Sequence, residues 1–456
     1  MHKKPTKLLG LSLNKFQDML DKGNEMHLQR ASLIPFHKPG DETSLTSIFL
    51  SSLKLIKEFR ENIFKATGLS KSGKIFVFTE VEFVFYDKKR VDGLILVLRG
   101  NKIVDSAILE MKNKNNEINE KQITDYIQIA KDYKISKLIT VSNQFVSNPS
   151  QSPINVKLPK NLTMYHLSWS YVLTVAHLLL FKNEENIIDE DQVEIMSEVV
   201  RYFEHGKSGV VGFTQMKQGW TDIVNKINVG TNIRLNDESL DDTIGSWLEE
   251  ERDMSLILSR RLGSIVHSVK KQFKNNLNRR IEYEKRFLIK NNHLESVLNI
   301  EGVVSSIVVR PHFDRRNIEM GVQLDAPLDR GTKAQLTWVK NQFKHLKKKN
   351  PESYTNIERE LKVEIWLKFF KNPILIDVNA LDEIFYSIKD KEIKSFNILQ
   401  IKYLGKKFES RKGFVQFIEN MLLEYYQVIV QHLKKWQKPA PKIVEKTQEK
   451  VQVEQK

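Results

Sequence analysis

Three charged residues, Asp92, Glu110 and Lys112, have types and spacing that suit chemistry on a phosphate ester. Asp92 interrupts the apolar segment RVDGLILVL, and Glu110 and Lys112 end the next one, KIVDSAILEMK. If that segment is a strand, Glu110 and Lys112 share one face, because side chains alternate along a strand. Two neighbouring carboxylates can hold Mg²⁺ or Mn²⁺, and a lysine beside them can orient or deprotonate a metal-bound water. An isolated E-x-K is more often a solvated ion pair, so the surrounding elements decide.

The elements that must position these residues alternate between helical and strand patterns. An apolar stripe of helical period covers residues 42–67, and three strands are expected within 74–112. A helix follows at 120–133, then a strand at KLITVSN, a short strand at LTMYHLSW and an apolar helix at YVLTVAHLLLF. The order of helix, three strands, helix and strand predicts an α/β unit with helices flanking a mixed sheet.

The turn between the second and third strands decides whether the two carboxylates meet. If the loop is only Gly100-Asn101 and the pairing is regular, Asp92 lies opposite Leu109 and faces away from Glu110. The proposed site therefore requires a loop with an odd number of residues, or a β-bulge in one of the two strands.

The element order and the charged residues together resemble the PD-(D/E)xK nuclease superfamily, whose core runs αβββαβ and would cover residues 42–145. The resemblance implies a restriction-endonuclease-like fold and metal-dependent hydrolysis of phosphodiester bonds. Asp92 and Glu110 would bind Mg²⁺ or Mn²⁺, and Lys112 would position the attacking water. Val91 stands where the superfamily name has proline, a position that varies widely.

Three further residues match features of this superfamily. Gln122 and Tyr126 lie on one face of the predicted helix and look like the QxxxY signature of the RecB-like branch, where the pair lies near the substrate and metal. Glu42 matches an acidic residue that many members carry in the first helix as an auxiliary metal ligand. Glu80 and Glu82 are additional acidic candidates, although a solvated face of an edge strand is the simpler reading of both.

The composition favours a polyanionic partner. The chain has 456 residues with 72 Lys and Arg against 57 Asp and Glu, a formal charge of +15. We expect nucleic acid, DNA rather than RNA, as the partner, although a lysine-rich proteome would also give a basic chain. There is no cysteine, which excludes disulfides and thiolate zinc sites and fits a cytoplasmic location. The sequence shows no signal peptide pattern and no apolar run long enough to span a membrane.

The chain is expected to divide into three parts. Residues 1–185 would form the nuclease domain, which ends at the acidic stretch EENIIDEDQVE. Residues 186–433 would form a basic, mainly helical or α+β domain that binds substrate or a partner, and residues 434–456 a disordered tail. Candidate phosphate-binding residues in two basic runs are Lys270, Lys271, Lys274, Arg279, Arg280, Lys347 and Lys348. The alternative is that both runs are solvated faces of amphipathic helices.

Two other functional readings remain open from the sequence. The fold could be a catalytically silent scaffold that binds nucleic acid or forms a complex, or the C-terminal half could be a sensor that gates a nuclease. A homodimer or a regulatory partner is compatible with either. The histidines His166 and His177 lack partners at ligand spacing and are expected to be structural, and GKSG at 206–209 is expected to be a loop.

Overall fold

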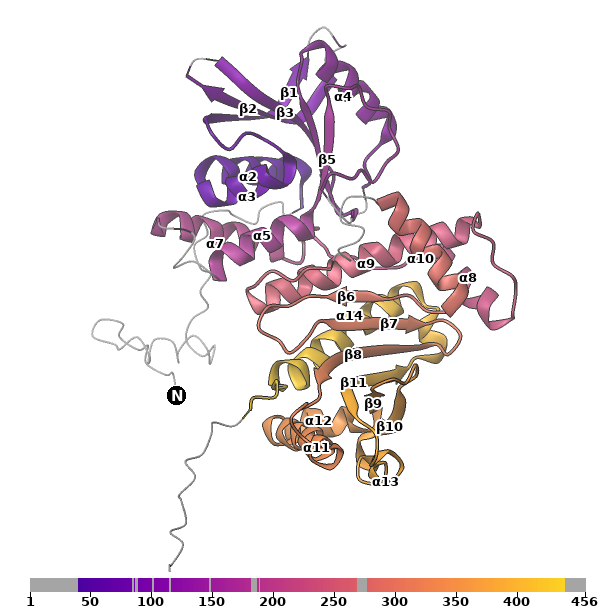
Figure 1. Cartoon of the computed structure of the whole chain (residues 1–456). Helices are drawn as coiled ribbons and strands as arrows, with labels where there is room; N and C mark the ends of the chain where they lie inside the picture. Colours follow the sequence, from indigo (N-terminus) through magenta and orange to yellow (C-terminus); the bar gives the residue numbers. More distant parts are fainter. Residues whose placement is uncertain are drawn as a thin grey trace, which may run out of the picture.

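A five-stranded mixed sheet forms the first part of the structure (Figure 1), a computed structural model that describes residues 40–83, 86, 89–100, 102–114, 116–146, 149–181, 187, 189–268 and 277–438. The strands are β1 (Lys74–Phe83), β2 (Lys89–Arg99), β3 (Lys102–Met111), β4 (Lys137–Ser142) and β5 (Thr163–Ser168), in that spatial order. The first three pair antiparallel, and β3, β4 and β5 pair parallel. The predicted mixed sheet of an α/β unit is therefore present.

Helices cover both faces of this sheet. On one face lies α4 (Glu120–Asp132), which packs against a small apolar cluster that includes Ile108 and Leu138. A larger cluster on the other face receives α2 (Glu42–Leu55), α3 (Lys57–Thr67), α5 (Trp169–Phe181) and α7 (Glu190–Glu204). This core extends to Phe203, so α7 packs with the first sheet although the boundary was predicted at residue 185.

The first helical segment differs from the single helix expected over 42–67. Ile56 adopts an extended conformation, with φ −111° and ψ 106°, and separates α2 from α3. The residue is fully buried, and the Arg60 guanidinium donates to the carbonyl of Leu53 at 3.0 Å. The break is stabilised by side-chain packing, which outweighs the continuous helical pattern of the sequence.

The second part of the chain is α+β, with a six-stranded antiparallel sheet in the order β10-β9-β11-β8-β7-β6. Its strands are β6 (Ser296–Leu298), β7 (Ile307–His312), β8 (Asn317–Asp325), β9 (Leu361–Leu367), β10 (Ile374–Asp377) and β11 (Ile393–Tyr403). The helices are α8 (Gln218–Asn228), α9 (Glu238–Leu262), α10 (Leu277–Asn291), α11 (Thr332–Lys349), α12 (Pro351–Ile357), α13 (Phe385–Ile388) and α14 (Arg411–Val428). The sequence had left a mainly helical and an α+β domain open for this part of the chain.

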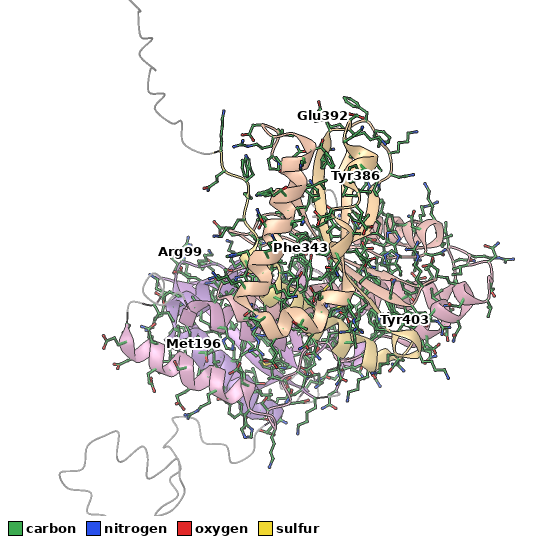
Figure 2. The ribbon with its side chains drawn as sticks, turned by 90° about the horizontal axis from the view of Figure 1, so that it is seen from below. Arg99, Met196, Phe343, Tyr386, Glu392 and Tyr403 are labelled. Carbon is green, nitrogen blue, oxygen red and sulfur yellow. The ribbon has the colours of Figure 1, made fainter. Side chains whose placement is uncertain are left out.

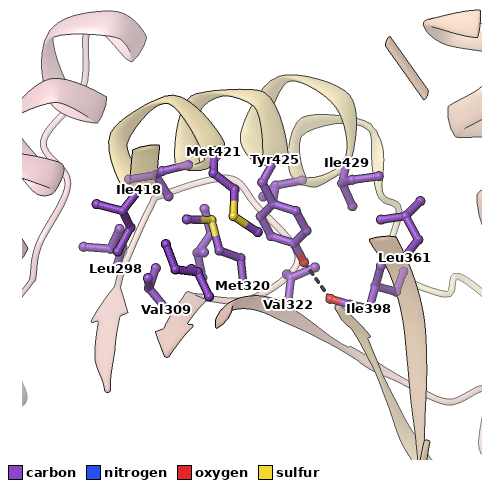
Figure 3. Packing of buried hydrophobic residues seen from close by; sticks show 14 of the residues in the cluster. Leu298, Val309, Met320, Val322, Leu361, Ile398, Ile418, Met421, Tyr425 and Ile429 are labelled. Carbon is purple, nitrogen blue, oxygen red and sulfur yellow. Dashed lines mark hydrogen bonds between the residues drawn. The ribbon is translucent and has the colours of Figure 1, made fainter. Parts of the chain in front are cut away.

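The second core lies between this sheet and α14. Figure 3 shows Met421 and Tyr425 of α14 over Met320 and Val322 of β8. The Tyr425 hydroxyl, fully buried, donates to the carbonyl of Ile398 at 2.6 Å. The two cores are separate clusters: Met196 belongs to the first and Phe343 to the second, and Figure 2 shows them on different parts of the molecule.

The two parts meet where α5 packs against α9. Asp253 of α9 is fully buried and accepts a hydrogen bond from the Ser170 hydroxyl at 3.0 Å. The Arg260 guanidinium donates to the hydroxyls of Ser170 and Thr174, both at 2.9 Å. This polar contact joins the two parts, because charged side chains of α9 form hydrogen bonds with hydroxyls of α5.

Two further predictions concern the ends and surfaces of the chain. Residues 439–456 of the predicted disordered tail lie outside the described residues, whereas Trp436 is described and its indole donates to Asp329 at 2.8 Å. Among the helices that the structure describes, none is both long and apolar enough to cross a membrane.

Candidate active site

A β-bulge in β3 brings Asp92 and Glu110 together. The hairpin begins with Arg99 opposite Lys102 and Leu98 opposite Ile103, but Val97 then pairs with Asp105 and Gly93 with Leu109. Val104 is the additional residue. Continuing this register places Asp92 opposite Glu110, on the same face of the sheet. The sequence required either an odd loop or a β-bulge for Asp92 and Glu110 to share a face, and the structure has the bulge.

The polar pair belongs to a row of side chains that crosses the sheet. Glu110 of β3 pairs with Thr140 of β4, and Thr140 pairs with His166 of β5. The Thr140 hydroxyl lies 2.8 Å from Nδ1 of His166, and Nε2 of His166 lies 2.8 Å from the carbonyl of Gln144. Burial lowers the pKa of His166 to about 4. Both ring nitrogens are used internally, so His166 is a structural residue.

Glu110 is the most deeply buried member of the site. Its side chain is fully buried, and neither carboxylate oxygen has a hydrogen-bond partner among the described residues. Oε1 does form an ion pair with the Lys112 ammonium at 2.5 Å. Burial, and then the negative charge of Asp92, raises the pKa of Glu110 to about 7. A buried carboxylate with free lone pairs is the kind of group that a cation can satisfy.

Asp92 is held by the backbone of the neighbouring strand. Its Oδ2 accepts a hydrogen bond from the backbone N–H of Met111 at 2.6 Å. Burial raises the pKa of Asp92, although the Met111 N–H and the Lys112 charge act in the opposite direction. The charge of Glu80 also raises this pKa, which indicates that Glu80 lies close to the site. Glu80 has a left-handed φ of 54° and forms an ion pair with Arg90 at 2.8 Å, whereas Glu82 is exposed.

Lys112 lies between two carboxylates. Its ammonium is 2.5 Å from Glu110 and 3.8 Å from Glu42. Burial alone would lower the pKa of Lys112, but the contact with Glu110 outweighs it and the pKa is raised. The Lys112 backbone is fixed on both sides, because its N–H donates to Val141 at 2.8 Å and its carbonyl accepts from the Trp169 indole at 2.9 Å.

Glu42 stands across Lys112 from the other two carboxylates. Its Oε1 accepts from the backbone N–H of Asn113 at 3.0 Å and from the side-chain amide of Asn116 at 2.7 Å. The side chain is about a third exposed. A polar cavity of about 480 Å³ opens here, lined by Gly40, Asp41, Glu42, Thr43, Asn113, Lys114 and Asn116.

Gln122 and Tyr126 lie on one face of α4, as their spacing predicted, and Tyr126 lies close to Glu110. The Gln122 amide donates to the Tyr126 hydroxyl at 3.0 Å, and this hydroxyl donates to the carbonyl of Arg90 at 2.8 Å. Burial, and then the charge of Glu110, raises the pKa of Tyr126. The tyrosine therefore closes the α4 side of the site and remains protonated.

The donor set fits a hard divalent cation with few protein ligands. Mg²⁺ is commonly bound by one or two carboxylates, with water and substrate phosphate completing its shell. Asp92 and Glu110 supply these two carboxylates from neighbouring strands. Within the described ranges, no three His, Asp or Glu side chains are arranged to hold a metal ion. The third predicted ligand, Glu42, contacts Lys112 instead.

Of the predicted phosphate-binding residues that the structure describes, Arg280, Lys347 and Lys348 do not form one surface with this site. Lys270, Lys271 and Lys274 lie outside the described residues. Arg280 is buried and donates to Glu251 at 2.8 Å, which removes it from a phosphate-binding surface because its charge is used inside the protein. Arg279 is exposed on α10.

The remaining two lysines are far from the first sheet. Lys347 and Lys348 are exposed on α11, which Figure 1 shows at the opposite end of the molecule from the first sheet. The Lys347 ammonium forms an ion pair with Glu358 at 3.1 Å. Any contact that these lysines make with nucleic acid would therefore be separate from the candidate active site.

Sequence reasoning did not select Asn113 and Trp169, which support Lys112 from either side. Asn113 directly follows the E-x-K motif, a position that would have singled it out, but Trp169 is distant in sequence and no local signal marks it. No protein-family model matches this chain, and a search of curated proteins gives no match.

Proposed function

We propose that the chain is a Mg²⁺- or Mn²⁺-dependent nuclease of the PD-(D/E)xK type, which hydrolyses phosphodiester bonds, most favourably in DNA. The observation that carries this proposal is the bulge at Val104, which places Asp92 opposite Glu110 with Lys112 in contact. An irregularity that aligns two carboxylates on one face is typical of functional sites.

Each residue of the candidate site would have a separate role in the reaction. Asp92 and Glu110 would hold the metal ion, which when bound supplies Lewis-acid activation of water and of the phosphoryl oxygen. Lys112 would orient the attacking water and offset negative charge that develops on the phosphate. Tyr126 and Gln122 close the α4 side and restrict the entry of bulk water. The polar cavity beside Glu42, of about 480 Å³, offers space for the substrate backbone.

The test is cleavage of circular and linear DNA, with RNA in parallel, in the presence of Mg²⁺, Mn²⁺ or EDTA. Asp92→Ala and Lys112→Ala should abolish metal-dependent cleavage in protein that remains folded. The control is Glu82→Ala, which removes an exposed carboxylate from β1 and should cut like the wild type. Equal cleavage by all three variants would refute the assignment of the site.

A second candidate function is that of a catalytically silent protein that binds nucleic acid or forms a complex on this fold. It is favoured by the ion pair between Lys112 and Glu110, which satisfies part of the charge that a metal would otherwise neutralise. Absence of both cleavage and metal binding, together with salt-dependent binding of DNA, would support this candidate.

A further inference from the structure

The segment between α7 and α8, residues 205–217, lies against the end of β3 that carries the candidate site; we call it the connector. The Asn113 side-chain amide donates to the carbonyl of Ser208 at 2.6 Å. Asn143 donates to the carbonyl of Gly209 at 2.7 Å and accepts from the N–H of Val211 at 3.2 Å. Three hydrogen bonds therefore hold the connector beside residues that follow Lys112 and β4.

Asn113 also holds the beginning of α2. Its side-chain amide donates to the carbonyl of Gly40 at 3.1 Å, and its backbone N–H donates to the Glu42 carboxylate at 3.0 Å. The Asn113 side chain is buried. One residue thus joins the connector, the start of α2 and the end of β3, so that Glu42 and Lys112 keep their relative positions only while all three segments stay in place.

The approach of the connector is close enough to require glycine at position 209. Gly209 has φ +77°, and a Cβ there would lie 2.6 Å from Cγ of Lys114 and 2.7 Å from Nδ2 of Asn113. Any side chain would push the connector away from β3 and would also strain the backbone. Gly206, three residues earlier, has no atom within 4 Å of a Cβ position.

The other end of the connector is attached to the second part of the chain. The N–H of Phe213 donates to the buried Asp253 carboxylate of α9 at 2.5 Å. The Met216 carbonyl accepts from the Arg411 side chain at 2.6 Å, and the Met216 N–H donates to the Arg411 carbonyl at 3.2 Å. The connector is therefore fixed at one end to the candidate site and at the other to α9 and the start of α14.

We propose that Asn113 is a positioning residue through which the connector makes the geometry of Lys112 and Glu42 depend on the placement of the second part of the chain. The proposal rests on the proposed function of the same site. Asn113 would act on the site through Lys112 and Glu42 rather than on the metal ligands Asp92 and Glu110. A displacement of α9 or α14 would act on Ser208 and Gly209, and through the Asn113 amide on the residue that follows Lys112.

The test compares Gly209→Ala with Gly206→Ala in the full-length chain. Two quantities are measured for each: the rate of Mn²⁺-dependent DNA cleavage, and amide hydrogen exchange of the peptide that contains Lys112 and Asn113. We expect Gly209→Ala to lower the cleavage rate by about tenfold or more, the usual effect on activity of losing an outer support of a metal site, and to accelerate exchange. Gly206→Ala should match the wild type in both.

A second variant removes two connector contacts without adding atoms. Asn143→Ala loses the bonds to Gly209 and Val211, together with one to the Lys114 carbonyl. It should change both quantities in the same direction as Gly209→Ala, even if the glycine variant fails to fold. Wild-type values for Gly209→Ala and Asn143→Ala in both measurements would overturn the proposal. If the wild type cuts no DNA in Mn²⁺, the proposed nuclease function fails, and the exchange rates alone still decide whether the connector holds Asn113.

Discussion

At the scale of single residues, the site is defined by two carboxylates and one ammonium whose charges depend on one another. Glu110 is fully buried, and its closest charged partner is the Lys112 ammonium at 2.5 Å. In the proposed site the two carboxylates bind the metal ion and Lys112 positions the attacking water. Substitution of Lys112 should therefore lower the rate of cleavage without removing metal binding.

Lys112→Met should lower DNA cleavage by about 10²- to 10⁴-fold, the range for loss of a group that positions or transfers a proton. Mn²⁺ binding should persist, because both carboxylates remain. Single-turnover cleavage and calorimetric titration measure the two effects. Lys102→Met, an exposed lysine at the other end of the same strand, is the control and should leave both unchanged. Loss of metal binding in Lys112→Met would show that the lysine maintains the metal site.

The pKa of about 7 at Glu110 predicts a pH dependence of metal binding. A metal ion binds the deprotonated carboxylate, so protons compete with it below this pKa. Affinity for Mn²⁺ should rise by up to about tenfold per pH unit below pH 7 and level off above it. Titrations between pH 5.5 and 8.5 measure this dependence, and an affinity independent of pH across that range would contradict it.

The raised pKa of Glu110 has the opposite effect on the stability of the metal-free protein. The folded carboxyl has a pKa above its ordinary value of 4.5, so the folded state binds more protons than the unfolded state between about pH 4.5 and 7. Its contribution to stability should therefore fall as pH rises through that window. Urea unfolding of the metal-free wild type and of Glu110→Gln measures this contribution, which the substitution should remove.

At the scale of elements, the β2–β3 hairpin decides whether the site exists. The sequence predicted both strands and the helix that carries Gln122 and Tyr126, because apolar alternation and helical spacing are local signals. The bulge at Val104 could be stated only as a requirement, since nothing in KIVDSAILEMK marks which residue remains unpaired. The break at Ile56 was missed for a related reason: packing of that side chain, rather than a glycine or proline, ends α2.

Engineered cysteine pairs can measure the register of this hairpin, because the chain contains no cysteine. Ile95 lies opposite Ala107, so Ile95→Cys with Ala107→Cys should form a disulfide under mild oxidation, since opposed Cα atoms lie within disulfide range. Ile95→Cys with Ser106→Cys should not, because those side chains point to opposite faces. Crosslinking of the second pair alone would show a regular ladder, with Asp92 turned away from Glu110.

At the scale of the whole molecule, the second part of the chain was the least predictable. Strands β9, β10 and β11 are short or lie between helices. Their alternation of apolar and polar residues, as in LKVEIWL, is a weak signal next to strongly charged flanking runs. Arg280 belongs to such a basic run, yet the fold pairs it with Glu251 inside the protein. Charge in the sequence therefore did not indicate exposure, because burial depends on contacts between distant segments.

The contact between the two parts predicts a large effect at Asp253. Asp253→Ala removes a buried acceptor from the Phe213 N–H and the Ser170 hydroxyl and leaves Arg260 without this counter-charge. We expect a loss of about 3–5 kcal/mol in the free energy of unfolding, typical of a broken buried charge pair. Urea denaturation measures it. Glu238→Ala, an exposed carboxylate in the first turn of the same helix, should cost less than about 1 kcal/mol, and equal losses would refute the role of Asp253.

The most direct test of the central claim, that Asp92 and Glu110 together form a metal site, is calorimetric titration of the purified chain with Mn²⁺. The wild type should bind Mn²⁺, and Asp92→Asn and Glu110→Gln should each abolish this binding. Glu82→Gln should bind Mn²⁺ as the wild type does. Circular dichroism confirms that each variant is folded. Unchanged binding by Asp92→Asn or Glu110→Gln, or no binding by the folded wild type at pH 8, would contradict the account.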